Sequence, residues 1–330
     1  MVSLYKRLLL PSTLKRHRNY TMKLFSLFVT LIIITNTTYA DINKAASKAE
    51  KPTIELKDKL NVIAKPTIIA LSPHIVEMLY DVGAGDQIIG TTTFADYPEE
   101  AKNIPQIGNY VRLQIERVIE LQPDLIIAWK SGSPSDDIGR LEQLGFNVIY
   151  SQPQTFADVA NEIRYFSKIT GHTEQGEKIA LTFEAELNKI TNRYKNKAEI
   201  IGFYELWSRP LTTVAKGSWP QQFLTICKVH NPFKKVLTPY PQVSIEQVLP
   251  SSIQLIIQPL SVNQTDREGF NWQDWPIIPA VKNKHIIQPN ADAIHRMTLR
   301  SLVALKDLCA EIDQTRTVLQ QNIANQTVSH

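Results

Sequence analysis

The chain has 330 residues, enough for two ordinary domains, and its 43% hydrophobic and 21% charged residues are typical of a globular protein. The formal net charge of +4 comes from the first forty residues, which contain six of the 36 Lys and Arg but none of the 32 Asp and Glu. The rest of the chain is therefore close to neutral, which argues against a nucleic-acid partner.

The first forty residues are typical of an export signal. Lys23 precedes a mainly apolar run, Leu24–Ile34, which is too short to cross a bilayer because a helix needs about 20 residues to span ~30 Å. Small residues then lead to a cleavage site after Ala40. We predict a cleavable signal at residues 1–40, in which residues 1–21 are an over-extended start because a later methionine opens a signal of normal length. An uncleaved membrane anchor is the alternative.

A Lys-, Ala- and Glu-rich tether (residues 41–66) precedes alternating strand and helix signals. Apolar residues predict a first strand at Ile68–Leu71, and Ser72 followed by Pro73 predicts the start of a helix. The next predicted elements are the strand Gln87–Thr93, a helix after Arg112, the strand Asp124–Trp129, the helix Ile138–Leu144 and the strand Asn147–Tyr150. This alternation predicts a parallel sheet with helices on both faces.

Strand signals are missing between about Phe156 and Asn196, and apolar residues recur there at helical spacing. We therefore predict that a connecting helix (173–197) joins an N-terminal lobe (67–172) to a C-terminal lobe (198–330). The second lobe is predicted to contain the strand Ile200–Leu206, a helix around Trp219–Cys227, a helix and a strand within Ser244–Gln258, the strand Ile286–Ile287 and the helix Thr298–Leu319. The predicted fold class is α/β, with two lobes of mostly parallel sheet and a ligand cleft between them.

Two segments that lie 130 positions apart are almost alike without a gap. They are Gln114–Ile127 and Ser244–Ile257, and six of their fourteen positions are identical. Each predicts a short helix, a turn and an apolar strand, so the two lobes are expected to share a plan. Glu116 and Glu246 stand at the same place in the first helical turn, where the helix dipole favours a carboxylate. Alternatively, they are a pair of negative groups for one symmetric, positively charged partner.

Recognised catalytic motifs are missing from the sequence. It has no GxSxG, phosphate loop, HExxH or carboxylate pair in a recognisable frame. The seven histidines form no HxH or HxxxH pair, which disfavours a metal site. His74 and His295 are the residues that a hydrolase or other enzyme would use. We expect a protein that is not an enzyme and needs neither a metal nor a cofactor.

Cys227 and Cys309 are the only cysteines in the chain. An even count in an exported protein favours a disulfide. Such a bond would close a loop of about 80 residues and contribute roughly 4 kcal/mol by loop entropy. Two buried thiols without a bond are the alternative.

Several aromatic residues lie where a strand passes to a helix, or in adjacent loops. In an open parallel sheet, the crevice beyond the carboxyl ends of the strands is the usual ligand site. Aromatic walls suit a large, flat, partly apolar ligand. Any one of these residues alone is more simply a core residue, but matching positions in two lobes favour a binding site. The four are Phe94, Tyr110, Trp129 and Tyr240.

Asp292 and Arg296 lie between the last predicted strand and the last predicted helix. Four positions apart on a helix, they would form a solvated pair worth a few tenths of a kcal/mol. They could equally offer an acceptor and a donor to polar groups of a ligand. The residue pattern alone favours the solvated pair.

Over about residues 67–312 the chain resembles the periplasmic cobalamin (vitamin B12)-binding proteins of bacterial corrinoid importers. The resemblance is carried by IIALSPHIVEML from Ile68, FADYPEEA from Phe94, IERVIELQPDLIIAW from Ile115 and YPQVSIEQVL from Tyr240. The LSP and QPDLII segments are shared with siderophore and haem receptors. FADYP, PQVSxEQV and the cysteine placement are closer to the cobalamin branch.

This resemblance implies two α/β lobes bridged by one long helix, limited closure of the lobes, and cobalamin in the cleft as cargo. Phe94 matches a ligand-contacting tyrosine of the family, and Trp129 matches a tryptophan. Tyr110 and Tyr240 fall where the family typically has tryptophans. The loop 292–296 matches a ligand-contacting loop. Its acid and its arginine are preserved, whereas the residues between them differ, so the loop reads Asp292, Ala293, Ile294, His295 and Arg296.

The resemblance also implies the partners. Glu116 and Glu246 match glutamates that dock into arginine pockets on the two subunits of a permease, and Cys227 and Cys309 match a disulfide pair. We therefore predict a periplasmic protein, monomeric when free, that captures cobalamin and delivers it to an ABC importer in the inner membrane. A receptor for haem or a ferric siderophore on the same scaffold is the first alternative, and an exported hydrolase is the second.

Overall fold

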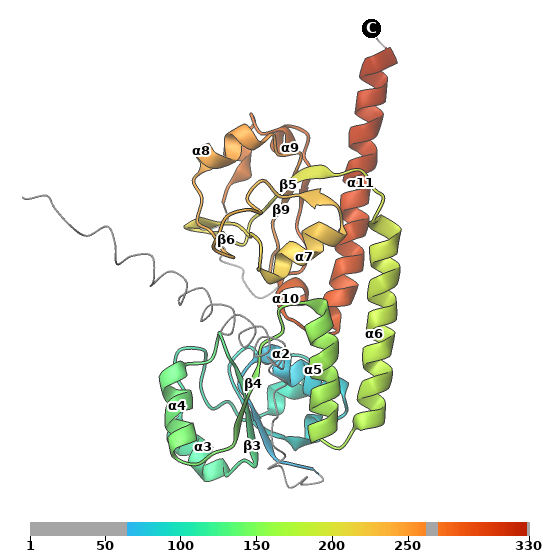
Figure 1. Cartoon of the computed structure of the whole chain (residues 1–330). Coiled ribbons are helices and arrows are strands. Elements are labelled where there is room, and N and C mark those ends of the chain that lie inside the picture. The colour runs from blue at the N-terminus through green and yellow to red at the C-terminus, as the bar shows by residue number, and fades with distance from the viewer. Residues whose placement is uncertain (1–64, 262–269, 329–330) are drawn as a thin grey trace, which may run out of the picture. The chain divides into compact units, whose positions relative to one another are not determined.

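The computed structural model describes residues 65–261 and 270–328 (Figure 1). The predicted signal at 1–40 and nearly all of the predicted tether at 41–66 lie outside these residues. Every described element belongs to one compact unit. In the described ranges, no helix combines the length and the apolar character that a membrane span requires.

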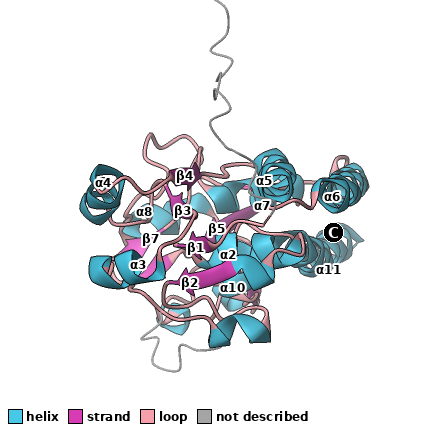
Figure 2. Cartoon of the chain, turned by 90° about the horizontal axis from the view of Figure 1, so that it is seen from below, coloured by secondary structure: helices cyan, strands magenta, loops and turns pink. Residues whose placement is uncertain are grey.

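The first four strands form one parallel sheet in the order β2-β1-β3-β4. Their bounds are β1 Ile68–Ala70, β2 Ile88–Thr91, β3 Leu125–Trp129 and β4 Val148–Ser151. The helices associated with them are α2 Pro73–Asp81, α3 Ile115–Leu121, α4 Ser135–Gln143 and α5 Phe156–Ile169. Figure 2 shows the strands between α3 and α4 on one side and α2 and α5 on the other. Helices thus cover both faces of the sheet, and this explains why the central strands are apolar throughout their length.

Successive residues of the central strands point to opposite faces of this sheet. Ile126 packs in a cluster with Val118 of α3 and Leu141 of α4. Ile127, the next residue, packs in a cluster with residues of α2 and α5. The sheet is therefore the middle layer of three, as the alternating strand and helix signals predict.

The connecting helix α6 covers Thr173–Tyr194 and packs along α5. The break between the two helices contains Gly171, whose φ of 82° lies in the left-handed region that glycine adopts readily. α6 has 22 residues and leads directly to the first strand of the second sheet.

The second sheet is also parallel, with the order β10-β9-β5-β8, and a separate antiparallel pair joins β6 to β7. The strands are β5 Ile200–Tyr204, β6 Trp207–Ser208, β7 Leu211–Thr212, β8 Val229–His230, β9 Leu255–Ile257 and β10 Ile286–Ile287. The helices are α7 Trp219–Ile226, α8 Ile245–Val248, α9 Pro279–Lys282, α10 Ala291–His295 and α11 Arg300–Val328. Short 3-10 helices occupy η1 Gly85–Gln87, η2 Glu99–Asn103, η3 Leu249–Ser251 and η4 Trp272–Asp274.

The repeated sequence segments form equivalent units, α3-β3 and α8-β9. Val118 and Val248 are both buried on the inner side of their helices. The turn that follows each helix contains a non-glycine residue in the left-handed region, Gln122 with φ 45° and Ser252 with φ 49°. The sequence repeat therefore extends to the backbone conformation of the turn.

One hydrophobic core runs beneath both sheets. The ring of Phe156, at the start of α5, lies 4.8 Å from that of Trp219 and 5.2 Å from that of Phe223, both in α7. A disulfide between Cys227 and Cys309 (Cα–Cα 4.9 Å) joins the end of α7 to α11. The predicted α/β fold, with two mostly parallel sheets and one long connecting helix, is confirmed.

Candidate functional site

The predicted ligand-binding residues follow the carboxyl ends of strands, where open α/β sheets bind ligands. Phe94 comes shortly after β2, and Trp129 is the last residue of β3. The predicted loop 292–296 follows β10 and forms α10, which lies in Figure 1 between the two sheets. Two sheets and one helix thus bring segments that are far apart in the sequence to the same region.

Arg296 is the centre of this region. Its Nη1 donates to Glu77 Oε1 and to Asp96 Oδ1, each at 2.9 Å, and its Nη2 donates to the backbone carbonyl of Phe94 at 3.2 Å. Asp292 lies 3.5 Å from Nη2. The side chain of Arg296 is only 13% exposed; burial acts to lower its pKa, but the hydrogen bonds to Glu77 and Asp96 raise it overall. Arg296 thereby fixes the backbone of the segment that carries Phe94.

The backbone of Phe94 has a φ of 69°, a left-handed conformation that costs a bulky residue about 1–3 kcal/mol. Its side chain is 67% exposed. The bond from Arg296 to its carbonyl helps to hold this conformation. The strained backbone therefore presents an aromatic ring to solvent beside a buried charge cluster.

The rest of the predicted loop is held from several sides. Asn290 caps α10 by accepting from the backbone N–H of Ala293 at 3.0 Å. Ser261 donates to Asp292 at 2.9 Å, and Nε2 of His295 lies 2.9 Å from the hydroxyl of Tyr204. Ile294 is fully buried, and its carbonyl accepts the indole N–H of Trp219 at 2.7 Å. Its side chain thus contributes to the core of the lobe.

Trp129 is half-buried and packs edge-on against His74, with ring centroids 5.6 Å apart. His74 is buried, and its nitrogens lie 2.7 Å from Ser72 Oγ and 2.9 Å from Ser151 Oγ. Burial and the nearby charge of Arg296 lower the pKa of His74 to about 3. A general base works best with a pKa near the working pH, so His74 is a poor proton acceptor for the adjacent serines.

Tyr110 and Tyr240 occupy loops ahead of α3 and α8. Tyr110 is 70% exposed, and the loop beside it is held by Asn109, which accepts from the backbone N–H groups of Val111 and Arg112. Tyr240 is about half exposed; burial raises the pKa of its hydroxyl, while a hydrogen bond from the backbone of Trp219 opposes the rise. The structure thus links Tyr240, through Trp219, to the α10 loop.

Glu116 and Glu246 stand in the first turns of α3 and α8, and both side chains are exposed. A hydrogen bond from the Ser244 side chain holds the pKa of Glu246 below its usual value. In that first turn Ser244 N–H also donates to Gln247 Oε1 at 2.9 Å. The two glutamates therefore occupy equivalent positions in the two lobes, and both face solvent.

Sequence reasoning missed four residues of the charge cluster: Glu77, Asp96, Tyr97 and Arg300. Arg300 donates to both oxygens of Glu77 and lies over the ring of Tyr97, 3.8 Å from its centroid. In the sequence, Asp96 and Tyr97 are distinguished only as part of the FADYP segment that carries the resemblance. Glu77 is a polar residue of the amphipathic helix α2, and its burial beside two arginines depends on contacts across more than 200 positions.

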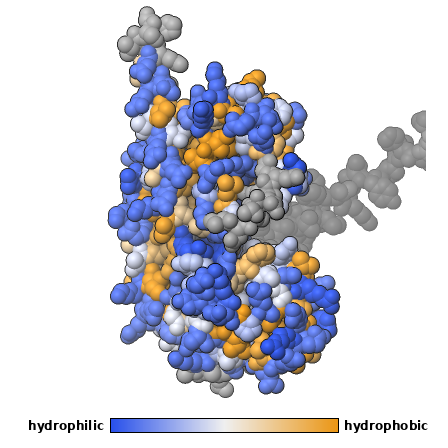
Figure 3. Space-filling model, turned by 180° about the vertical axis from the view of Figure 1, so that it is seen from behind, coloured by the Kyte–Doolittle hydropathy of each residue, from blue (hydrophilic) through white to orange (hydrophobic). Residues whose placement is uncertain are grey.

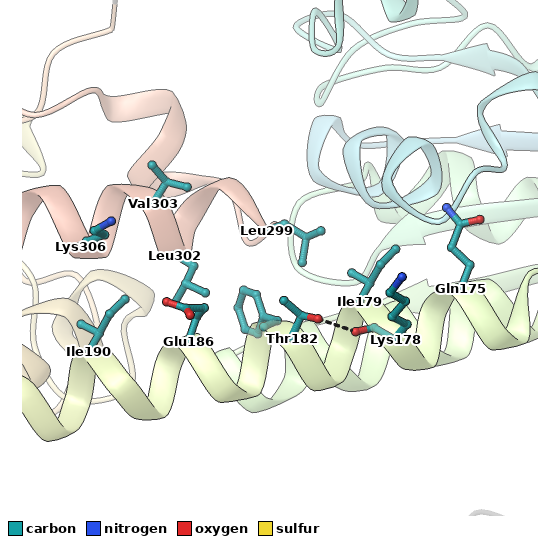
Figure 4. Close-up of a pocket in the computed structure, with 11 residues that line it drawn as sticks. Gln175, Lys178, Ile179, Thr182, Glu186, Ile190, Leu299, Leu302, Val303 and Lys306 are labelled. Carbon is teal, nitrogen blue, oxygen red and sulfur yellow. Dashed lines mark hydrogen bonds between the residues drawn. The ribbon is translucent and has the colours of Figure 1, made fainter.

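A groove of about 700 Å³ lies apart from these residues, between α6 and α11 (Figure 4). Its walls are mainly apolar, and its charged lining residues are Lys178, Glu186 and Lys306. In Figure 3, which shows the molecule from behind, hydrophobic surface interrupts the mostly hydrophilic face beside the long helices. The groove includes none of the predicted site residues. Across the described ranges, no group of three or more His, Cys, Asp or Glu is placed to hold a metal ion.

Comparison with known proteins identifies the family to which the chain is similar. Residues 68–293 match the family model described as "Periplasmic binding protein". The vitamin B12-binding protein of Vibrio campbellii is 37% identical over 250 residues, which cover 76% of this chain and 90% of that protein. The counterpart of Vibrio vulnificus is 36% identical over 253 residues, covering 76% and 92%.

Solved structures give the same result for the fold. The crystal structure of the periplasmic vitamin B12 binding protein BtuF of Vibrio cholerae matches with a TM-score of 0.69 and 34% identity, covering 76% of this chain and 98% of that one. A periplasmic heme-binding protein from Roseiflexus has a TM-score of 0.68 at 19% identity, covering 76% and 99%, which shows a shared fold alone. On the family match and on the length and identity of these alignments, the chain belongs to the periplasmic binding protein family.

Proposed function

We propose that this protein captures cobalamin (vitamin B12) in the periplasm and delivers it to an ABC importer in the inner membrane. The observation that carries the proposal is the 37% identity to a vitamin B12-binding protein, because the alignment includes 90% of that relative. Heme-binding proteins share the fold at 14–19% identity only, so they provide no specific argument for haem.

The aromatic residues provide the apolar contact in this proposal. Cobalamin is large and carries a flat ring system, and such ligands bind in clefts lined by aromatic side chains. Phe94 and Tyr110 are mostly exposed, Tyr240 is about half exposed and Trp129 is half-buried, so all four have surface available for a ligand.

Polar recognition comes from Asp292 and Arg296. The periphery of cobalamin carries amide groups, which offer both N–H donors and carbonyl acceptors. Asp292 accepts from such donors, and the Nη2 of Arg296, whose present partners lie at 3.2 and 3.5 Å, can donate to such acceptors. The other residues of the loop, from Ala293 to His295, shape and support this pair.

Delivery depends on Glu116 and Glu246. Both are exposed at the start of equivalent helices, so they offer the same charge in the same local geometry. A dimeric permease has two equivalent subunits, and one positively charged pocket on each would receive one glutamate. In this proposal the binding protein is a monomer when free, and it needs no further cofactor because cobalamin is its cargo.

The proposal includes export and lobe organisation. A signal at 1–40 sends the chain to the periplasm, a tether at 41–66 precedes the lobes at 67–172 and 198–330, and the helix at 173–197 joins them. The protein is not an enzyme: the buried His74 stays neutral beside its serines, which supports a structural role for that cluster.

The experiment is a calorimetric titration of the exported form with cyanocobalamin, haemin and a ferric siderophore. We expect saturable binding of one cyanocobalamin per protein, which neither of the other ligands displaces. Saturable binding of haemin or the siderophore, with no cyanocobalamin binding, would overturn the proposal.

A further inference from the structure

The indole of Trp129 is held from one side by a glycine. After Trp129 the chain turns back, so that the backbone N–H groups of Gly132 and Ser133 both donate to the Trp129 carbonyl, at 3.1 and 2.8 Å. The Trp129 N–H donates to Ser133 Oγ at 2.9 Å. A Cβ added to Gly132 would lie 1.9 Å from Cε3 of the indole. The ring therefore rests against the glycine backbone, and a larger residue at 132 must displace it.

The same indole is held by His74. The two rings meet edge-on, at an angle of 80° between their planes. Edge-to-face contact is a favoured geometry for aromatic rings because the positive edge of one meets the negative face of the other. His74 is only 3% exposed, so its own position is fixed by the surrounding structure.

The orientation of His74 is set by a chain of hydrogen bonds. Glu162 of α5 accepts from Ser151 Oγ at 2.6 Å and from the backbone N–H of Gln152 at 2.7 Å. His74 Nε2 is hydrogen-bonded to this same Ser151 Oγ at 2.9 Å. His74 Nδ1 is hydrogen-bonded to the hydroxyl of Ser72 at 2.7 Å, so both ring nitrogens have a partner. These hydrogen bonds fix the orientation of the His74 ring, using residues of α2, β4 and α5.

We propose that His74 and Gly132 are positioning residues that hold the Trp129 indole as a preformed wall of the ligand site. This inference rests on the proposed function, in which Trp129 contacts cobalamin. A preformed wall raises affinity because the side chain loses little freedom when the ligand binds. The rings of Phe94 and Tyr110 are mostly exposed and form the adaptable walls, whereas Trp129 is the fixed one.

The test combines Gly132→Ala and His74→Leu with a double-mutant cycle against Trp129→Ala. Gly132 lies in a turn, so its variant keeps the core and displaces only the ring. Each variant should weaken cyanocobalamin binding by about three- to tenfold when Trp129 is present, and by much less in the Trp129→Ala background. The matched control is Gly139→Ala, because an added Cβ at Gly139 has no heavy atom within 4 Å; it should leave affinity unchanged.

A ligand-free measurement separates positioning from general destabilisation. The near-ultraviolet circular dichroism of Trp129, taken as the difference between the unmodified protein and Trp129→Phe, should fall strongly in both variants. His74→Gln, whose amide can still donate to Ser151, should restore part of the band and of the affinity. Equal loss of affinity with and without Trp129, or an unchanged Trp129 band, would overturn the inference. Failure of the unmodified protein to bind cyanocobalamin would instead overturn the proposed function, and the dichroism result would stand by itself.

Discussion

Glu77 and Arg296, which are 219 positions apart in the sequence, form an ion pair of 2.9 Å. The Glu77 side chain is 1% exposed, and Arg300 donates to the same carboxylate. One buried carboxylate thereby joins the first helix of the first lobe to the end of α10 and the start of α11. Removing it would leave two guanidinium groups without their common partner.

We expect Glu77→Ala to lower the free energy of unfolding by about 3–5 kcal/mol, because breaking one side of a buried ion pair leaves uncompensated charge. Denaturant unfolding followed by far-ultraviolet circular dichroism measures the change. Glu99→Ala is the control, since its pair with Lys102 is largely exposed and should contribute little to stability. Equal effects of the two substitutions would show that the Glu77 cluster has no special role in stability.

Phe94 combines strain with exposure, so its substitutions should separate stability from binding. Phe94→Gly relieves the left-handed backbone and should raise stability by about 1 kcal/mol, while the loss of the ring weakens cyanocobalamin binding. Phe94→Ala also loses the ring but keeps the strain, so it should weaken binding without raising stability. Thermal unfolding and ligand titration of both variants check this. A Phe94→Gly protein less stable than Phe94→Ala would contradict it.

Glu162 should make stability depend on pH. Burial raises its pKa from the ordinary value of 4.5 to about 7. Between these values the folded chain keeps a proton that the unfolded chain has released, so this group's contribution to stability falls as pH rises. A shift of this size corresponds to about 3 kcal/mol. The stability of the unmodified protein relative to Glu162→Gln should therefore decrease from pH 4 to pH 8.

Denaturant unfolding at several pH values measures this difference. Glu174→Gln, which removes an exposed acid from the first turn of α6, is measured in parallel as the control. A constant difference for Glu162→Gln would mean that Glu162 has an ordinary pKa.

The disulfide should contribute strongly to stability. Cys227 and Cys309 are 82 positions apart, and a loop of that length corresponds to about 4 kcal/mol in the loop-entropy model. The double variant Cys227→Ser and Cys309→Ser should lose stability of that order under oxidising conditions. The reduced protein should lose a similar amount, and the double variant should not respond to reductant. If the double variant also loses stability in reductant, the loss seen in the unmodified protein does not come from this disulfide.

The exposed glutamates should act in transport and not in ligand binding. Glu116→Ala combined with Glu246→Ala should abolish cobalamin uptake by cells that depend on this protein, while cyanocobalamin affinity stays unchanged. Each single variant should reduce uptake in part, because one contact with the permease remains. Glu174→Ala is the matched control, since it also removes an exposed first-turn acid. A large loss of affinity in the double variant would contradict the docking role.

Much of the fold follows from local sequence. Apolar runs such as Ile68–Ala70 predict central strands, and Ser72-Pro73 correctly places the start of α2. The second repeat helix is shorter than the first because Pro250 lacks an N–H donor, so α8 passes into the 3-10 turn η3. Very short strands such as β8 carry too little pattern to be recognised.

The charge cluster of the site could not be predicted in the same way. Asp292 and Arg296, four positions apart, favour a solvated helix pair, but α10 ends at His295 and Arg296 leaves the helical path. Its guanidinium then reaches Glu77 and Asp96 in the other lobe. Such partners are chosen by the packing of whole elements, which no local pattern of residues records.

The ring of Phe156 belongs to the first lobe by sequence, yet it packs against Trp219 and Phe223 of the second. A chain cut at the turn before α6 would therefore yield two fragments, each lacking part of its own interior. Proteolytic or genetic halves should be insoluble when produced separately and recover only when produced together. Both sheets should accordingly melt in a single cooperative transition, however far apart their strands lie along the chain.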